Sequence, residues 1–486
     1  MENMTMMGKS QSSQPKLFYH EFSLENRLLQ EHVLRKVKRL VNFDFVRSQV
    51  TDLYGANGNR SVDPAVILKL MFLLFFEDIK SERVLMEQLP LRLDWLWFCG
   101  YDIDNQTPNH SVISKARRRW GVEVFAEFFA NILKQCIDTC LVDGAMVHID
   151  SSMIDGNVSK DSLRPQLRVL GRQLYDKLEL QLQTAPLEQR VSKTDPDARL
   201  GRKNGQTTLG YKDHRVVDDK NGIVTATITT AANIHDGKML AEAIEQHQDN
   251  TGVKVDTTIA DKAYGNSANY KYLKEHDITP CIPHQKHVCK QESDFAHDKF
   301  TYDKRSDCYI CPAGQQLHRY DRSRPYKNNA YRYRAKRAVC MQCQFFEKCV
   351  FSHSSGRQVR RNLDAEYVAW ADGSLSDARR KRLMGRRRTK AEGAFADAAN
   401  NHGFKHARWR GLLKMTIQNL MIAAVQNLRK LMRRLVRDAA VNAFAVTKTG
   451  LAELCLSADL ILCHSEMMFR HLATEHPFWR EQGRDS

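Results

Sequence analysis

The spacing of apolar residues along the chain changes near residue 143. Before it, apolar positions recur at helical spacing, and Asp63 and Pro64 supply an N-cap and a first-turn proline for the apolar run at 66–76. From about 145 to 285, short β-favouring runs alternate with segments of helical spacing. This alternation predicts a mixed α/β sheet behind a helical N-terminal region.

Four local patterns add detail. An antiparallel hairpin is expected about the turn signal at 218–222, and a polar helix from Leu163 to about Thr184. Two predicted strands end in acids, at Asp150 and Asp261. A long amphipathic helix from about Leu412 to Leu435 is expected to pack against the sheet.

Charge narrows the classes of partner. Lys and Arg number 74 against 57 Asp and Glu, a net charge of +17, so the protein attracts polyanions, with nucleic acid the first expectation and an anionic membrane surface the second. The start of the chain lacks the pattern of a secretory signal, and the run at 66–76 is too short to span a bilayer. We therefore expect a soluble, cytoplasmic protein that has no membrane partner.

Three acids suggest metal chemistry. Asp150 and Asp261 follow β-rich segments, where open α/β sheets form ligand sites, and Glu392 opens an apolar helix behind a basic run at 379–390. Carboxylates from neighbouring strand ends bind divalent cations, and a third acid completes a two-metal site for in-line phosphoryl displacement. Taken singly, each Asp is more simply a turn former or a helix cap.

Three segments carry a family resemblance. "HIDSSMIDGNVS", "TIADKAYGN" and "TKAEGAFADAANNHGFKHARWRG" resemble, in order, the three catalytic blocks of DDE-type transposases encoded by bacterial insertion sequences, and the similarity covers most of residues 40–430. It implies a ribonuclease H-like catalytic core, with Asp150, Asp261 and Glu392 as the catalytic acids that hold two Mg²⁺ or Mn²⁺ ions.

A cysteine cluster precedes Glu392. Cys311, Cys340, Cys343 and Cys349 match the resemblance, whereas spacing alone makes Cys308, Cys311, Cys340 and Cys343 an equally good tetrad for structural Zn²⁺. Buried free thiols are the alternative to both. The isolated Cys99, Cys136, Cys455 and Cys463 are expected to be core residues.

Three groups of basic residues are candidates for DNA phosphate contacts. They are Lys115, Arg117, Arg118 and Arg119 on a short helix; Arg386, Arg387, Arg388 and Lys390 before the catalytic acid; and Lys405, Arg408 and Arg410 after it. An ordinary solvated basic face is the alternative interpretation for each group.

These observations divide the chain into six parts. We expect a flexible N-terminus at 1–20, a helical DNA-binding domain at 21–142, the first part of the ribonuclease H-like core at 143–285 with a loop insertion at about 160–210, a cysteine-rich insertion at 286–375, core completion with the catalytic helix and basic run at 376–440, and a helical tail at 441–486.

The expected function is that of a DNA transposase. It would bind the ends of an insertion sequence as a dimer or larger assembly on double-stranded DNA, hydrolyse the phosphodiester at each end, and transfer the freed 3′-OH strands to target DNA. Two other interpretations fit the same residues: a non-catalytic DNA-binding protein derived from a transposase, and a metal-dependent nuclease without strand transfer.

Overall fold

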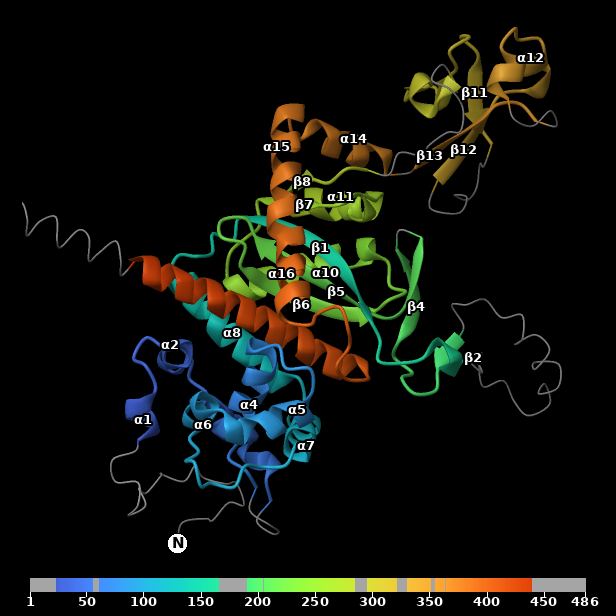
Figure 1. Ribbon diagram of the computed structural model, residues 1–486. Coiled ribbons are helices and arrows are strands. Elements are labelled where there is room, and N and C mark those ends of the chain that lie inside the picture. Colours follow the sequence, from blue (N-terminus) through green and yellow to red (C-terminus); the bar gives the residue numbers. More distant parts are fainter. Residues whose placement is uncertain are drawn as a thin grey trace, which may run out of the picture. The chain divides into compact units, whose positions relative to one another are not determined.

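The computed structural model describes residues 23–55, 61–165, 190–203, 205–284, 295–320, 330–350, 355–362 and 364–438 (Figure 1). The expected flexible N-terminus and C-terminal tail lie outside these residues, as do Cys455 and Cys463. The chain divides into two compact units, 1–428 and 429–486, and the described part of the second unit is the end of a helix that begins at 412.

The N-terminal region is helical, as predicted. Its α-helices are α1 (Leu24–Arg27), α2 (Val33–Leu40), α3 (Phe45–Val50), α4 (Pro64–Phe76), α5 (Glu82–Gln88), α6 (Leu93–Cys99), α7 (Ser111–Trp120) and α8 (Glu123–Asp138). The Asp63 side chain caps α4 by accepting a hydrogen bond from the Ala65 amide. Every residue of α4 except Lys69 is buried, so α4 is the central helix of this region.

The central sheet confirms the predicted fold class. It contains β1 (Met146–Asp155), β4 (Arg199–Lys203), β5 (Gln206–Asp218), β6 (Val224–Ala231), β7 (Thr257–Ala260) and β8 (Thr279–Cys281). Strand β1 lies between β5 and β7; β5 is antiparallel to both β1 and β6, and β7 is parallel to β1 and β8. The antiparallel strands β4, β5, β6 and β1, extended by the parallel strands β7 and β8, give the mixed sheet of a ribonuclease H-like core.

Helices cover both faces of this sheet. On one face, α10 (Leu240–Thr251), α11 (Ser267–Glu275) and α14 (Ala365–Gly373) share a core with β1, β5, β6 and β7. On the other, the helix beginning at 412 meets the strands through polar contacts: Gln426 with Arg215 at 2.8 Å and Asn419 with Thr229 at 2.7 Å. Residues 417–428 are buried all round, so this segment lacks the polar outer face expected of an amphipathic helix.

Four expectations about this core need correction. The segment 163–165 is strand β2 (Leu163–Pro165), paired with β3 (Arg190–Ser192), and not the start of a helix. The insertion expected at about 160–210 ends earlier, because β4 and β5 already belong to the central sheet. The insertion expected at 286–375 also ends earlier, because α14 packs in the core. Strand β1 continues five residues past Asp150, which therefore lies inside the strand.

The hairpin prediction is confirmed, with β5 and β6 joined at 218–224. Helix α15 (Asp377–Arg387) runs through the π-helical segment η11 (Arg388–Glu392) into α16 (Gly393–Asn401). Glu392 thus lies within a continuous helical run. The sequence had predicted, wrongly, that Glu392 begins a helix.

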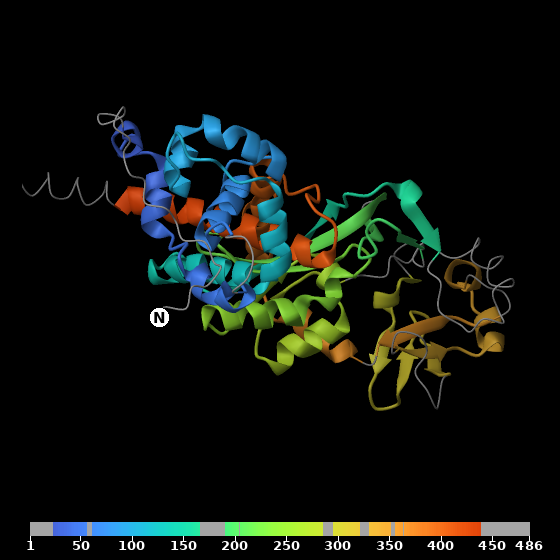
Figure 2. The same cartoon turned by 90° about the horizontal axis from the view of Figure 1, so that it is seen from below.

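A second, smaller sheet follows the core strands in sequence. It contains β9 (Thr301–Asp303), β10 (Cys308–Ile310), β11 (Gln316–Arg319), β12 (Ala330–Arg334) and β13 (Gln358–Asn362), all antiparallel, with α12 (Arg337–Met341) and α13 (Phe346–Cys349) between the last two strands. These elements form the yellow-to-orange group in Figures 1 and 2. No helix among the described residues is long and apolar enough to cross a membrane.

Candidate active site

Two of the predicted acids are neighbours across the central sheet. Ile149 of β1 pairs with Ala260 of β7 in parallel register, so the next residues, Asp150 and Asp261, lie side by side. Asp261 directly follows β7 and accepts a hydrogen bond from the Ala263 amide at 2.8 Å. Asp150 is buried and accepts one from the Ser151 amide at 2.8 Å.

Arg387 links the third acid to this pair. Its Nη2 atom lies 2.9 Å from Asp150 Oδ2, and its Nη1 atom lies 3.0 Å from Glu392 Oε1. The guanidinium is largely buried, at 13% exposure, while the Glu392 side chain is about half exposed. One positive charge is therefore shared by two carboxylates from separate elements, β1 and the helical run.

The π-helical segment explains how Arg387 and Glu392 meet. Residues five apart in an α-helix point about 140° away from one another, since each residue turns the chain by about 100°. A π turn closes over five residues and brings such a pair onto one face. Segment η11 begins directly after Arg387 and ends at Glu392, so the irregular turn aligns their side chains.

Burial sets the protonation of Asp150. The pKa of this carboxyl is raised, chiefly because burial disfavours its charged form, and nearby Asp261 acts in the same direction. Arg387 and then Lys203 oppose the shift through their positive charge. The positive charges of Arg387 and Lys203 thus only partly offset the cost of burying this carboxylate.

The helical run is also fixed to the hairpin turn. Arg386 forms an ion pair with Asp219, whose other oxygen lies 2.8 Å from Nε2 of the buried His148. Lys390 donates to the Lys220 carbonyl at 3.0 Å. Burial lowers the pKa of His148 despite its carboxylate partner. His148 is thus a buried, hydrogen-bonded residue that supports the strand bearing Asp150.

Two lysines contact the residues that follow Asp150 in β1. Lys203 of β4 donates to the Ser151 carbonyl at 2.8 Å, and Lys405 donates to Ser152 Oγ at 2.7 Å. Burial and then the charge of Lys203 lower the pKa of Lys405. Sequence reasoning missed Lys203, because nothing in the local pattern shows that the β4–β5 hairpin returns it to β1.

The structure divides the candidate DNA-contacting residues into buried and exposed ones. Arg117 is buried, paired with Glu82 and stacked 3.7 Å from the Trp409 ring centroid, and Arg408 is paired with Asp78 at 2.8 Å with 8% of its side chain exposed. These two cations hold protein segments together, so neither belongs to an exposed basic surface. The exposed candidates are Lys115, Arg118, Arg119, Arg386, Arg388, Lys405 and Arg410.

A groove lies at the end of β1. It has a volume of about 490 Å³ and is lined by residues 155–159 together with His406, Ala407 and Arg410. Arg410 donates to the Asn157 carbonyl at 2.8 Å, and Asp155 forms a β-bridge with His406. The end of β1 and the segment after α16 thus form an open polar surface.

The acids have the donor chemistry of a divalent metal site. Carboxylate oxygens are the ligands that Mg²⁺ and Mn²⁺ prefer. Among the residues that the structure describes, no three histidine, cysteine or acidic side chains already converge closely enough to hold an ion. Ion binding here would therefore require Glu392 and Asp150 to exchange Arg387 for the metal.

The sheet order and the position of the acids define a protein of the ribonuclease H-like class. Two family models match the chain: a transposase domain (DUF772) over residues 22–119 and a transposase DDE domain over residues 310–432, which includes Glu392. Over these two segments the chain is therefore similar to DDE transposases.

One curated relative and one solved structure are also similar. The transposase for insertion sequence element IS1106 of Neisseria meningitidis serogroup B is 39% identical over 85 residues, which is 17% of this chain and 27% of that protein. A cryo-EM structure of the piggyBac transposase synaptic complex with hairpin DNA aligns with this chain at 10% sequence identity. The alignment covers 77% of this chain and 67% of the chain in that structure. Its TM-score of 0.33 is too low to add to the description of the fold.

Proposed function

We propose that this protein is a DNA transposase that cuts at the ends of an insertion sequence and joins the freed strands to target DNA. The observation that carries the proposal is the Arg387 guanidinium held between Asp150 and Glu392, with Asp261 in the adjacent strand position. Two acids share one positive charge and the third follows the neighbouring strand, so three carboxylates from separate elements are available to a metal-dependent phosphoryl-transfer site.

Asp150, Asp261 and Glu392 would hold two Mg²⁺ or Mn²⁺ ions. Bound there, the ions would lower the pKa of the attacking water or 3′-OH and stabilise the leaving oxygen of an in-line displacement. Lys203 and Lys405, which contact the two residues after Asp150, would position the DNA phosphates next to the acids.

Double-stranded DNA is the proposed partner. The net charge of +17 favours association with polyanions, and Lys115, Arg118 and Arg388 present exposed cations on two different helical segments. Joining two element ends in one reaction requires a dimer or a larger assembly on DNA. Phosphate contacts do not read sequence, so recognition of the ends would rest on other residues.

A strand-transfer assay tests this function. Purified protein is incubated with labelled DNA that carries the element ends, supercoiled target DNA and Mg²⁺, and products are resolved on denaturing gels. Joined products that are absent with Asp261→Asn support transposition. Nicking without joining identifies a nuclease, and binding without any cleavage identifies a non-catalytic DNA-binding protein; either result contradicts the proposal.

A further inference from the structure

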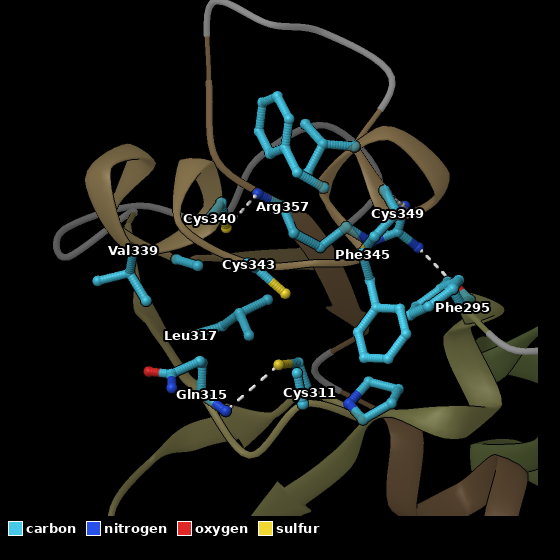
Figure 3. A pocket seen from close by; sticks show the side chains of 15 residues that line it. Phe295, Cys311, Gln315, Leu317, Val339, Cys340, Cys343, Phe345, Cys349 and Arg357 are labelled. Carbon is cyan, nitrogen blue, oxygen red and sulfur yellow. Dashed lines mark hydrogen bonds between the residues drawn. The ribbon is translucent and has the colours of Figure 1, made fainter.

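Four thiols of the second sheet line one small cavity (Figure 3). Cys311 comes from the turn after β10, Cys340 and Cys343 from α12 and the turn that follows it, and Cys349 from the end of α13. The cavity has a volume of about 30 Å³, which is room for a single water or ion. All four cysteines are free thiols of intermediate exposure.

We infer that Cys311, Cys340, Cys343 and Cys349 bind one structural Zn²⁺ ion and that Cys308 does not take part. This site is separate from the proposed active site, and its existence does not depend on transposition. Its four donors are sulfur atoms, which select Zn²⁺ over the hard cations suited to the carboxylates.

Strand geometry excludes Cys308. In the β10–β11 pair, Tyr309 lies opposite Leu317, and Cys308 lies opposite His318. Successive residues of a strand point to opposite faces, so Cys308 faces away from the side that bears Tyr309 and Leu317. Leu317 lines the cavity and Cys308 does not. Spacing alone allowed Cys308 as a ligand, but the alternation of β10 turns its thiol away.

The surroundings of the thiols suit thiolate ligands. The Gln315 amide donates to Cys311 Sγ at 3.3 Å, and the Arg357 amide donates to Cys340 Sγ at 3.5 Å. N–H···S hydrogen bonds of this kind orient and stabilise metal-bound thiolates.

The turn after β10 also supports Cys311 as a zinc ligand. Within 311–315, the Gly314 amide donates to the Cys311 carbonyl at 2.8 Å, and Gly314 adopts a φ of +74°. Only glycine adopts this conformation readily, and it lets the chain fold back so that the next amide reaches the sulfur. Cys343 likewise follows Cys340 through a turn closed by a 3.1 Å amide–carbonyl hydrogen bond.

The small core of this sheet explains why a metal is needed. Its buried cluster consists of Phe300, Tyr309, Leu317, Tyr333, Ala335 and Val359. Small domains with so few core residues require disulfides or a metal to hold their fold. The thiols do not yet converge at ligand spacing, so zinc binding is expected to turn them into the cavity and to draw the α12–α13 segment against the sheet.

Zinc content of the full-length protein tests the inference. Protein purified without added chelator should contain about one zinc per chain, and Cys308→Ser should retain it, whereas Cys311→Ser and Cys349→Ser should lose most of it. Absence of zinc from the wild type overturns the site. Retention in Cys349→Ser with loss in Cys308→Ser overturns the choice of ligands.

A second measurement covers the case in which a variant fails to fold. Native wild-type protein is alkylated with iodoacetamide with and without chelator, and modified cysteines are mapped by mass spectrometry. Chelation should expose the four proposed ligands to alkylation, while the exposed Cys140 reacts in both conditions. Equal labelling of the four cysteines with and without chelator contradicts the site, whatever the DNA-cleavage result.

Discussion

Arg387 reaches Asp150 across the gap between the helical run and β1, with 2.9 Å between Nη2 and Oδ2. The same guanidinium holds Glu392 at 3.0 Å. In the proposed mechanism these oxygens belong to divalent ions, so Arg387 competes with the metal for the same carboxylates. In that mechanism, Arg387 would balance the negative charge of the buried Asp150 before the metal binds.

Removing this competitor should increase the effect of metal on stability. In EDTA, Arg387→Gln should melt at a lower temperature than the wild type, because breaking a buried ion pair costs about 3–5 kcal/mol. Added Mn²⁺ should raise its melting temperature more than that of the wild type, since bound ligand stabilises the folded state. Arg382→Gln, on the exposed side of α15, is the control. Equal Mn²⁺ shifts in the wild type and Arg387→Gln contradict the competition.

The adjacent residues Arg117 and Arg118 of α7 should differ in their effects on DNA binding and on stability. Arg118→Ala should reduce the slope of log affinity for DNA against log salt by about one unit, as expected when one phosphate contact is lost. Arg117→Ala should leave that slope unchanged but destabilise the protein by about 3–5 kcal/mol, because it leaves the largely buried Glu82 without its partner. Salt titrations of DNA binding and urea unfolding separate the two outcomes. A change of slope in Arg117→Ala would show that its side chain reaches DNA.

Buried histidines should make the fold sensitive to acid. Burial lowers the pKa of His214 from 6.5 to about 4. Between these two pH values His214 is protonated in the unfolded chain but neutral in the folded protein. His214 therefore destabilises the fold progressively as pH falls from 6.5 to about 4, by up to about 3 kcal/mol.

His214→Gln tests this pH dependence, because glutamine does not titrate but still offers hydrogen bonds to Thr230. Unfolding free energies measured between pH 7 and pH 4 should fall less steeply in the variant than in the wild type. Parallel curves would show that His214 does not cause the acid sensitivity.

Lys203 should matter for cleavage although it lies 53 residues from Asp150 in sequence. Lys203→Met keeps the apolar stem and removes the charge near the phosphates, so single-turnover nicking should slow by about 10- to 100-fold. Lys254→Met, at an exposed lysine distant in sequence, is the matched control and should cleave at the wild-type rate. Nicking at the wild-type rate by Lys203→Met would show that this lysine does not act in the proposed site.

The sequence allowed the central sheet to be predicted because strands, hairpin turn and helices each carry local signals. Asp261 and the hairpin at 218–224 were placed correctly for this reason. Asp150 was placed at a strand end because β-branched residues stop after Ile149, whereas pairing with β5 extends β1 to Asp155. Neighbouring strands, rather than propensity, decide where this strand ends.

Parts of the candidate site depend on tertiary contacts that no local pattern encodes. The π turn that aligns Arg387 with Glu392 lies in an ordinary helical sequence. Arg117 and Lys115 look alike in the basic run, and only the packing of Glu82 and Trp409 separates a buried arginine from an exposed lysine. Cys308 and Cys349 were likewise equivalent by spacing until the register of β10 was known.

Metal-dependent nicking by single acid variants tests the central claim most directly. Wild type, Asp150→Asn, Asp261→Asn and Glu392→Gln are compared in single-turnover reactions on end-containing DNA with Mg²⁺, after DNA binding and melting temperature show that each variant is folded. The account predicts that every variant binds DNA and loses nicking by at least about 100- to 1,000-fold. Nicking at the wild-type rate by any one of them would contradict the assignment of that acid to the active site.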